Sequence, residues 1–278
     1  SETITVKYAP VDGTAKAGED YVASAGTLTF APGVTAKNVP VAIKGDGIYE
    51  ADEVCYVVLT EPNRAMLDVD LAEVTIRNDD PVPGLSIDNV SVLEGNTNTT
   101  SAIFTVRLSG PSSQTISVDY ATLDGTANAG TDYASASGTL FFAAGSTAQT
   151  ITVRISGDTL YEPDETLTVN LTRATNATLS EGQGLGTIRN DEDLPELLIS
   201  DAAALEGDAG TKDLAFTISL TGPSSLEIAV DVAAAPGSAT VPDDFSFAAR
   251  TLKFPPGSTN QTVVAVIVGD RTEEPDET

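Results

Sequence analysis

Short segments in which apolar and polar residues alternate run through the whole chain. In its central part these segments are AIFTVRL (102–108), TISVDYAT (115–122), GTLFFAAG (138–145), QTITVRIS (149–156), ETLTVNL (165–171) and GLGTIRN (184–190). Turns rich in Gly, Pro, Asp and Ser separate them, and no segment keeps a period near 3.6 residues. The pattern predicts half-buried β-strands. About seven short strands in roughly 110 residues are typical of a two-sheet sandwich with immunoglobulin-like packing, with a barrel as the alternative.

One sequence unit is repeated more than twice along the chain, at a constant offset of 112 residues. The phrase DGTAKAGEDY (12–21) returns as DGTANAGTDY (124–133) and, in altered form, as PGSATVPDDF (236–245). The motif GPSS at 110–113 returns at 222–225, and no gap is needed anywhere. A period of this length indicates a small domain rather than a solenoid repeat. We therefore expect tandem all-β domains: 1–80 without its first two strands, 81–193 complete, and 194–278 without its last two, as a piece of a longer array.

Composition excludes several classes of function. The chain has 278 residues, no His, one Cys and a net charge of −27. Such a charge repels nucleic acid and anionic lipid, and no apolar run is long enough for a membrane helix. Without His, a nucleophilic triad is absent, and a pair such as Glu162 and Glu165 fits a metal site better than a glycosidase. The single Cys55 is expected to be a buried strand residue, because it stands where the next copy has Leu167.

Acidic residues recur at fixed positions within the unit. The pattern GD-x-x-x-E-x-x-E occurs once in each copy, and strand alternation brings its loop, the loop at 124 and the exit near 191 to the same end of the sandwich. Calcium takes six to eight oxygen ligands, mainly from carboxylates, so the pattern predicts calcium there, with two ions fitting better than one. A solvated acidic face is the alternative. The pattern places acids at Asp46, Glu50, Glu53, Asp158, Glu162, Glu165, Asp270, Glu274 and Glu277.

The motifs T-x-DGTA-x-AG-x-DY, GTL-x-F-x-x-G, GD-x-x-x-E-x-DE and I-x-NDD resemble the Calx-beta domain, as found in bacterial extracellular arrays. The resemblance covers the whole chain and implies an immunoglobulin-like sandwich with Ca²⁺ at one end. It implies further ligands at Asp12, Asp79 and Asp80 in the first copy, at Glu94, Asp124, Asp191 and Glu192 in the second, and at Glu206 in the third. Because the third copy has no acid in place of Asp124, we expect weaker binding there. Tyr133 is expected to be a packing residue with a solvated hydroxyl.

The favoured function is a calcium-stiffened segment of an extracellular stalk, fibre or adhesin at the cell surface, not an enzyme. Its expected partners are neighbouring repeats or copies of the same chain, and a protein adhesion target is possible. Neither nucleic acid nor membrane insertion is expected. The alternatives are a calcium-sensing regulatory module and a protein-binding adhesion module. The millimolar affinity of extracellular calcium modules suits the first reading.

Overall fold

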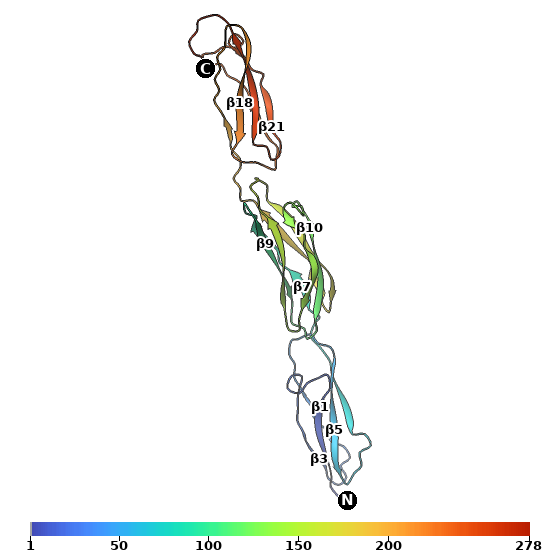
Figure 1. Ribbon diagram of the computed structural model, residues 1–278. Coiled ribbons are helices and arrows are strands. Elements are labelled where there is room, and N and C mark those ends of the chain that lie inside the picture. The colour runs from blue at the N-terminus through green and yellow to red at the C-terminus, as the bar shows by residue number, and fades with distance from the viewer. Residues whose placement is uncertain (1) are drawn as a thin grey trace.

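The computed structural model describes residues 2–278, which form three all-β units joined end to end in an elongated molecule (Figure 1). Each unit is built from strands that lie along the long axis, and the termini are at opposite ends. The predicted all-β fold of tandem sandwiches is confirmed. Among the described residues no helix is long and apolar enough to cross a membrane.

The second unit shows the complete architecture. One sheet has the order β12-β10-β14-β16-β8 and the other β11-β13-β9-β7-β15, so two open sheets make a sandwich and not a barrel. Most neighbours are antiparallel, but β16 pairs with β8, and β15 with β7, in parallel. The strands are β7 (Gly84–Ile87), β8 (Val90–Leu93), β9 (Thr99–Leu108), β10 (Ile116–Asp124), β11 (Tyr133–Ala134), β12 (Ser137–Phe142), β13 (Ala148–Ser156), β14 (Glu165–Thr175), β15 (Thr178–Glu181) and β16 (Gln183–Arg189).

The core lies between these sheets and follows the alternation of the sequence. Phe104 and Val106 of β9 are fully buried, and so are Leu167 and Val169 of β14, whereas the residues between them face outward or are half-buried. Every second side chain of a strand points to one face, so each strand contributes one row to the core. Cys55 is fully buried at the position equivalent to Leu167, as predicted.

The first and third units hold parts of the same arrangement. The first contains counterparts of β10 to β14 and of β16, and the third contains counterparts of β7 and of β9 to β13. In the complete unit three strands, β7 to β9, precede β10. This is one strand more than the sequence predicts, because the chain changes sheet between β7 and β8. The strands are β1 (Ile4–Asp12), β2 (Tyr21–Val22), β3 (Gly26–Phe30), β4 (Ala42–Ile43), β5 (Glu53–Asn63), β6 (Leu71–Ile76), β17 (Leu197–Ile199), β18 (Gly210–Leu220), β19 (Ile228–Val232), β20 (Phe245–Ser246), β21 (Arg250–Phe254) and β22 (Asn260–Gly269).

The segment 202–205 occupies the position of β8 in the third unit but forms no strand. It reads AAAL where β8 reads VSVL, and its Leu205 is 87% exposed. In the second unit β8 is held by pairing with β16, and no counterpart of β16 occurs among the described residues of the third unit. The missing partner strand and the alanines, which favour a strand less than valine does, together leave this segment irregular.

We expect Leu167→Ala to lower the free energy of unfolding of the second unit by about 2–5 kcal/mol, because it leaves a cavity in a fully packed core. Leu123→Ala, at a position 61% exposed, is the matched control and should change it by about 0.5 kcal/mol or less. Amide hydrogen exchange of β13 and β14 in the full chain measures both. Equal losses in the two variants would contradict the placement of the core.

Candidate metal centres

Two groups of carboxylates lie at one end of the second unit. In each group three side chains place carboxylate oxygens within 4.8 Å of one another. The loop group lies beside β11 and β14, and the exit group lies where the chain leaves β8 and β16. The loop group consists of Asp132, Glu162 and Glu165, and the exit group consists of Glu94, Asp191 and Glu192.

Local hydrogen bonds set the positions of the loop group. Asp132 ends a turn in which the Asn128 amide N–H donates to its Oδ2 at 2.7 Å, so one carboxylate oxygen holds the turn and the other remains available. Glu165 is the first residue of β14. The Glu162 amide donates to Oδ1 of Asn190 at 3.0 Å, which ties the loop to the end of β16. Three segments distant in sequence are thereby brought to one point.

The exit group depends on a close approach of two backbones. A Cβ on Gly157 would overlap the carbonyl oxygen of Gly95, so only glycine lets the loop after β13 lie against the loop after β8. The Gly95 amide donates to Oδ1 of Asp191 at 2.9 Å. The Asn96 side chain donates to Oε1 of Glu192 at 2.7 Å. These contacts carry the carboxylate of Glu94, which is only 4% exposed, against the exit of the unit.

Burial and mutual repulsion disfavour the ionised forms of these groups. Burial, followed by the facing carboxyl of Glu192, raises the pKa of Glu94 to about 8. Burial, followed by the charge of Asp132, raises the pKa of Glu165 to about 7. Burial likewise raises the pKa of Glu162, with the charges of Asp132 and Asp158 adding to it. Carboxylates in such positions are stabilised either by protonation or by a cation.

The donor set fits a hard divalent cation. Oε1 of Glu94 and Oε2 of Glu192 are buried and have no hydrogen-bond partner, which is costly unless another group satisfies them. Among residues 2–278 none of the ion pairs includes a member of either group. Oxygen-only sites of clustered carboxylates suit calcium, and the absence of His and Cys at the site excludes the usual zinc set.

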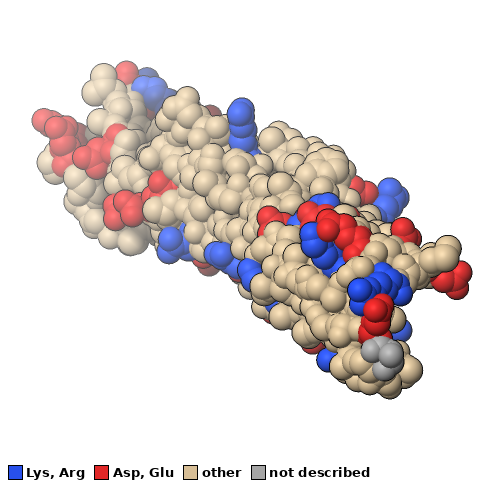
Figure 2. Space-filling view, turned by 90° about the horizontal axis from the view of Figure 1, so that it is seen from below, with Lys and Arg blue, Asp and Glu red and all other residues tan. Residues whose placement is uncertain are grey.

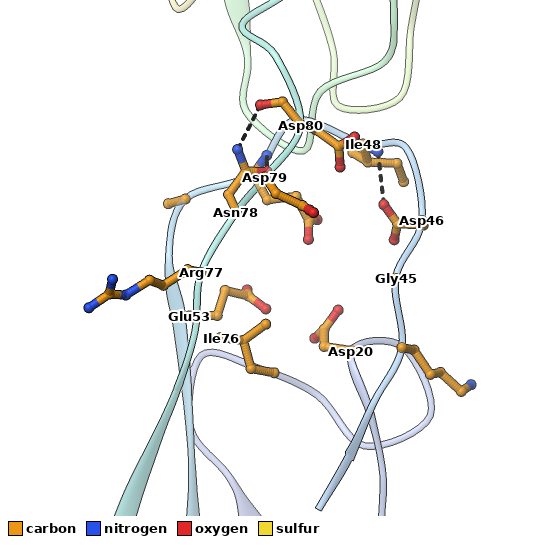
Figure 3. A pocket seen from close by; sticks show the side chains of 13 residues that line it. Asp20, Gly45, Asp46, Ile48, Glu53, Ile76, Arg77, Asn78, Asp79 and Asp80 are labelled. Atoms are coloured by element: carbon orange, nitrogen blue, oxygen red, sulfur yellow. Dashed lines mark hydrogen bonds between the residues drawn. The ribbon is translucent and has the colours of Figure 1, made fainter.

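The loop group recurs in the other two units. Asp20, Glu50 and Glu53 meet within the same distance in the first unit, and Figure 3 shows Asp20 and Glu53 facing each other across the pocket that they line. The supporting bonds recur too, because Asn78 accepts from the Glu50 amide at 3.1 Å. In the third unit the corresponding group is Asp244, Glu274 and Glu277.

The predicted ligands Asp12 and Asp124 lie outside these groups. Oδ1 of Asp12 accepts from the Tyr21 hydroxyl at 2.7 Å and from the Ala17 amide at 2.9 Å. Asp124 makes the same contacts with Tyr133 and Ala129. The two aspartates therefore brace the turn that carries Asp20 or Asp132. The prediction of a solvated Tyr133 hydroxyl is wrong, because this hydroxyl donates to Asp124, and burial raises the pKa of Tyr133 to about 12.

Other predicted residues surround the groups without being members. Asp158 accepts from the Leu160 amide at 2.7 Å and lies close enough to both groups to raise the pKa of Glu94 and Glu162. Asp46 and Asp270 make the equivalent turn bond. Asp79 and Asp80 line the pocket of the first unit, near Asp46 (Figure 3). The charge of Glu206 contributes to the raised pKa of Glu274 and Glu277.

The sequence reading missed the aspartate that completes each loop group. Asp20, Asp132 and Asp244 precede the aromatic residue at the end of the repeated phrase, and this position is acidic in all three copies, whereas Pro236 replaces Asp124 in the third. An acidic residue at this position in every copy is the feature of the sequence that could have identified these ligands. The third unit therefore keeps its three-carboxylate loop group, and weaker binding there stays a prediction.

Comparison with known families agrees with this architecture. Residues 1–80, 77–192 and 201–278 each match the model of the Calx-beta domain. This chain belongs to the Calx-beta domain family. The resemblance inferred from the motifs is thereby confirmed over nearly the whole length.

Relatives include membrane exchangers and a matrix protein. The chain is 33% identical over 189 residues to sodium/calcium exchanger 2 of Mus musculus, which covers 62% of the chain and 20% of the exchanger. It is 28% identical over 291 residues to extracellular matrix protein 3 of Lytechinus variegatus, which covers 97% of the chain and 9% of that protein. The chain thus spans about a fifth or less of the length of these relatives.

Solved structures with similarity are Calx domains. The apo form of the Calx CBD1 domain is 25% identical with a TM-score of 0.35, and the alignment covers 40% of this chain and all of that one. The CBD12 pair from CALX1.2 is 22% identical with a TM-score of 0.35, over 67% of this chain and 87% of that one.

We expect Asp132→Asn to weaken cation binding by the second unit about tenfold or more, because affinity depends on the number of charged ligands. Asp124→Asn is the matched control: it preserves the shape of the bracing residue and removes no member of the loop group. Calorimetric titration of the full chain compares the two. A larger effect of Asp124→Asn would show that the ligand lies on the other aspartate of the phrase.

Without a cation, the second unit should lose stability as the pH rises from about 5 to about 8. The folded unit retains protons on Glu94 and Glu165, whose pKa values are raised to about 8 and about 7, after the unfolded chain has released them. Saturating cation should abolish this loss, because it stabilises the ionised carboxylates. Urea unfolding of metal-free protein at several pH values tests this, and Glu94→Gln should flatten the dependence.

Proposed function

We propose that this chain is a calcium-binding segment of an extracellular stalk, fibre or adhesin, in which calcium stiffens the junctions between Calx-beta domains. The observation that carries the proposal is the position of the carboxylate groups. Each complete junction in Figure 1 places the acidic end of one unit against the beginning of the next. An ion held there neutralises carboxylates that otherwise repel each other at a hinge.

Calcium suits these groups better than magnesium. The donors come from separate segments with differing geometry, and calcium accepts irregular coordination by six to eight oxygens, whereas magnesium requires a near-ideal octahedron. Relatives of this chain are named sodium/calcium exchangers, and a similar solved structure is described as a calcium binding domain, which supports the choice of ion.

The distribution of charge and the extended shape support a spacer role. Figure 2, seen from the N-terminal end, shows acidic groups both at the near end, beside basic groups, and at the far end, with largely uncharged surface between them. The chain has no His, so it lacks the histidine base that a nucleophilic triad needs. A catalytic role is therefore not part of the proposal. The relative that covers 97% of the chain is named an extracellular matrix protein, which supports an extracellular location.

A calcium-sensing module is the second candidate, and the exchanger relatives favour it. Affinity separates the two functions. A stalk exposed to external calcium needs dissociation constants of only about 10⁻⁴–10⁻³ M, whereas sensors operate at about 10⁻⁷–10⁻⁵ M. The partners of a stalk would be neighbouring repeats, copies of the same chain or a protein adhesion target.

Calcium at about 100 times its dissociation constant should add about 2.7 kcal/mol to the free energy of unfolding of the second unit in the full chain. The double variant Asp158→Asn, Glu162→Gln should remove most of this gain, and it should not destabilise the calcium-free protein at neutral pH, because it removes two of the repelling carboxylates. Urea unfolding in calcium, magnesium and chelator, followed by hydrogen exchange, measures it. Equal stabilisation of the wild type and the double variant would contradict the site, and a micromolar constant would favour the sensor.

A further inference from the structure

The acidic loop of the first unit makes main-chain hydrogen bonds to a turn of the second unit. The Tyr49 amide N–H donates to the carbonyl of Pro111 at 3.1 Å, and the Ser113 amide N–H donates to the carbonyl of Tyr49 at 3.0 Å. Together these bonds form a parallel bridge between Tyr49 and Ser112. These bonds join the main chains of two domains immediately beside Glu50 of the loop group.

The same contact is repeated at the next junction. Tyr161 donates to Pro223 and accepts from Ser225, both at 3.0 Å, and it forms a parallel bridge with Ser224. The receiving turn has the sequence Gly-Pro-Ser-Ser at 110–113 and again at 222–225. Two junctions with different flanking sequences thus use one geometry, so the contact belongs to the repeat and not to one accidental packing.

The turn is built for this contact. Ser112 is a polar residue with only 2% exposure, and its hydroxyl donates to the Tyr49 carbonyl at 3.1 Å while accepting from the Gln114 amide at 3.0 Å. Ser224 is 3% exposed and accepts from the Leu226 amide at 3.0 Å. A buried hydroxyl requires partners, and here a partner is supplied by the preceding unit.

The linker is the second connection at each junction, and hydrogen bonds hold it at both ends. On one side the Asn78 side chain donates to the carbonyl of Asp80 at 2.9 Å. On the other side Gly84 donates to Oγ of Ser109 at 2.9 Å. Two separate attachment points restrict rotation between neighbouring units far more than one point does.

We propose that the Gly-Pro-Ser-Ser turn is a docking element that sets the orientation of each unit on the acidic loop of the preceding one, before any cation binds. Its partner is the backbone of a GD-x-x-x-E-x-x-E loop in another Calx-beta unit, read through main-chain groups. The side chain at the bridging position therefore need not be Tyr, which agrees with Glu273 at that position of the third copy.

The docking also acts beside the loop group. Tyr49, whose backbone bonds the turn, stands directly before Glu50, and Tyr161 stands directly before Glu162. The following unit thus positions a side chain of the cation site in the preceding unit. This part rests on the proposed calcium function, whereas the docking itself needs no ion.

The test uses the full chain with pairs of spin labels across each junction. Labels at Thr60→Cys and Thr152→Cys span the first junction, and labels at Thr152→Cys and Thr262→Cys span the second. All three positions are exposed, whereas the native Cys55 is fully buried and should not react in the folded protein. In chelator, Ser113→Pro removes the N–H that donates to Tyr49 and should shift and broaden the first distance distribution. Ser225→Pro is the matched control, because it should alter only the second distribution.

Unchanged distributions in both proline variants in chelator, with each unit still folded by circular dichroism, would overturn the docking element. Ser113→Pro should also weaken calcium binding by the first unit and spare the second unit, because it releases the backbone directly before Glu50. If calcium changes neither distribution nor stability of the wild type, the proposed calcium function fails, while the effect of the proline variants still decides the docking.

Discussion

The crowding of carboxylates at one end of each unit is the constraint on which the arrangement depends. Oxygens from three side chains meet within 4.8 Å, and no Lys or Arg among the described residues forms an ion pair with them. Burial, and after it the neighbouring like charges, raises the pKa of these carboxyl groups, and that of Glu94 is raised to about 8. The unit therefore stores a repulsion that a divalent cation can relieve.

This repulsion is tolerated because the rest of the domain fixes the backbones that carry it. A core row such as Phe104 and Val106 holds the sheets together, and Asn190 ties the acidic loop to the last strand. Glycine at position 157 allows two loops to approach at van der Waals distance. Rigid strands thus position side chains that would separate on a flexible chain, as preorganised ligand sites require.

The same end of the unit also receives the next domain. Tyr49 and Tyr161 lie within the acidic loops and pair by main-chain hydrogen bonds with Ser112 and Ser224 of the following units. Cation binding and the relative orientation of domains therefore involve one segment of chain. In an array of such units, the ion site and the junction thus share one loop.

The sequence by itself determined the strands, the repeat and the end at which acids gather. Alternation with period two is a local property, and a 112-residue offset can be read directly from the phrases at 12–21 and 124–133. The identity of Cys55 as a buried residue followed from its alignment with Leu167.

Tertiary structure alone decided which acids belong together. Asp124 and Asp132 stand in one phrase with the same chemistry, but the turn directs Asp124 to the hydroxyl of Tyr133 and Asp132 to Glu165. Strand pairing likewise places β8 beside β16 in the second unit, although the two strands stand at opposite ends of its sequence. The contact between Tyr49 and Ser112 joins residues 63 positions apart, and the sequence shows the Gly-Pro-Ser-Ser motif of the turn but not the backbone of the acidic loop that it meets.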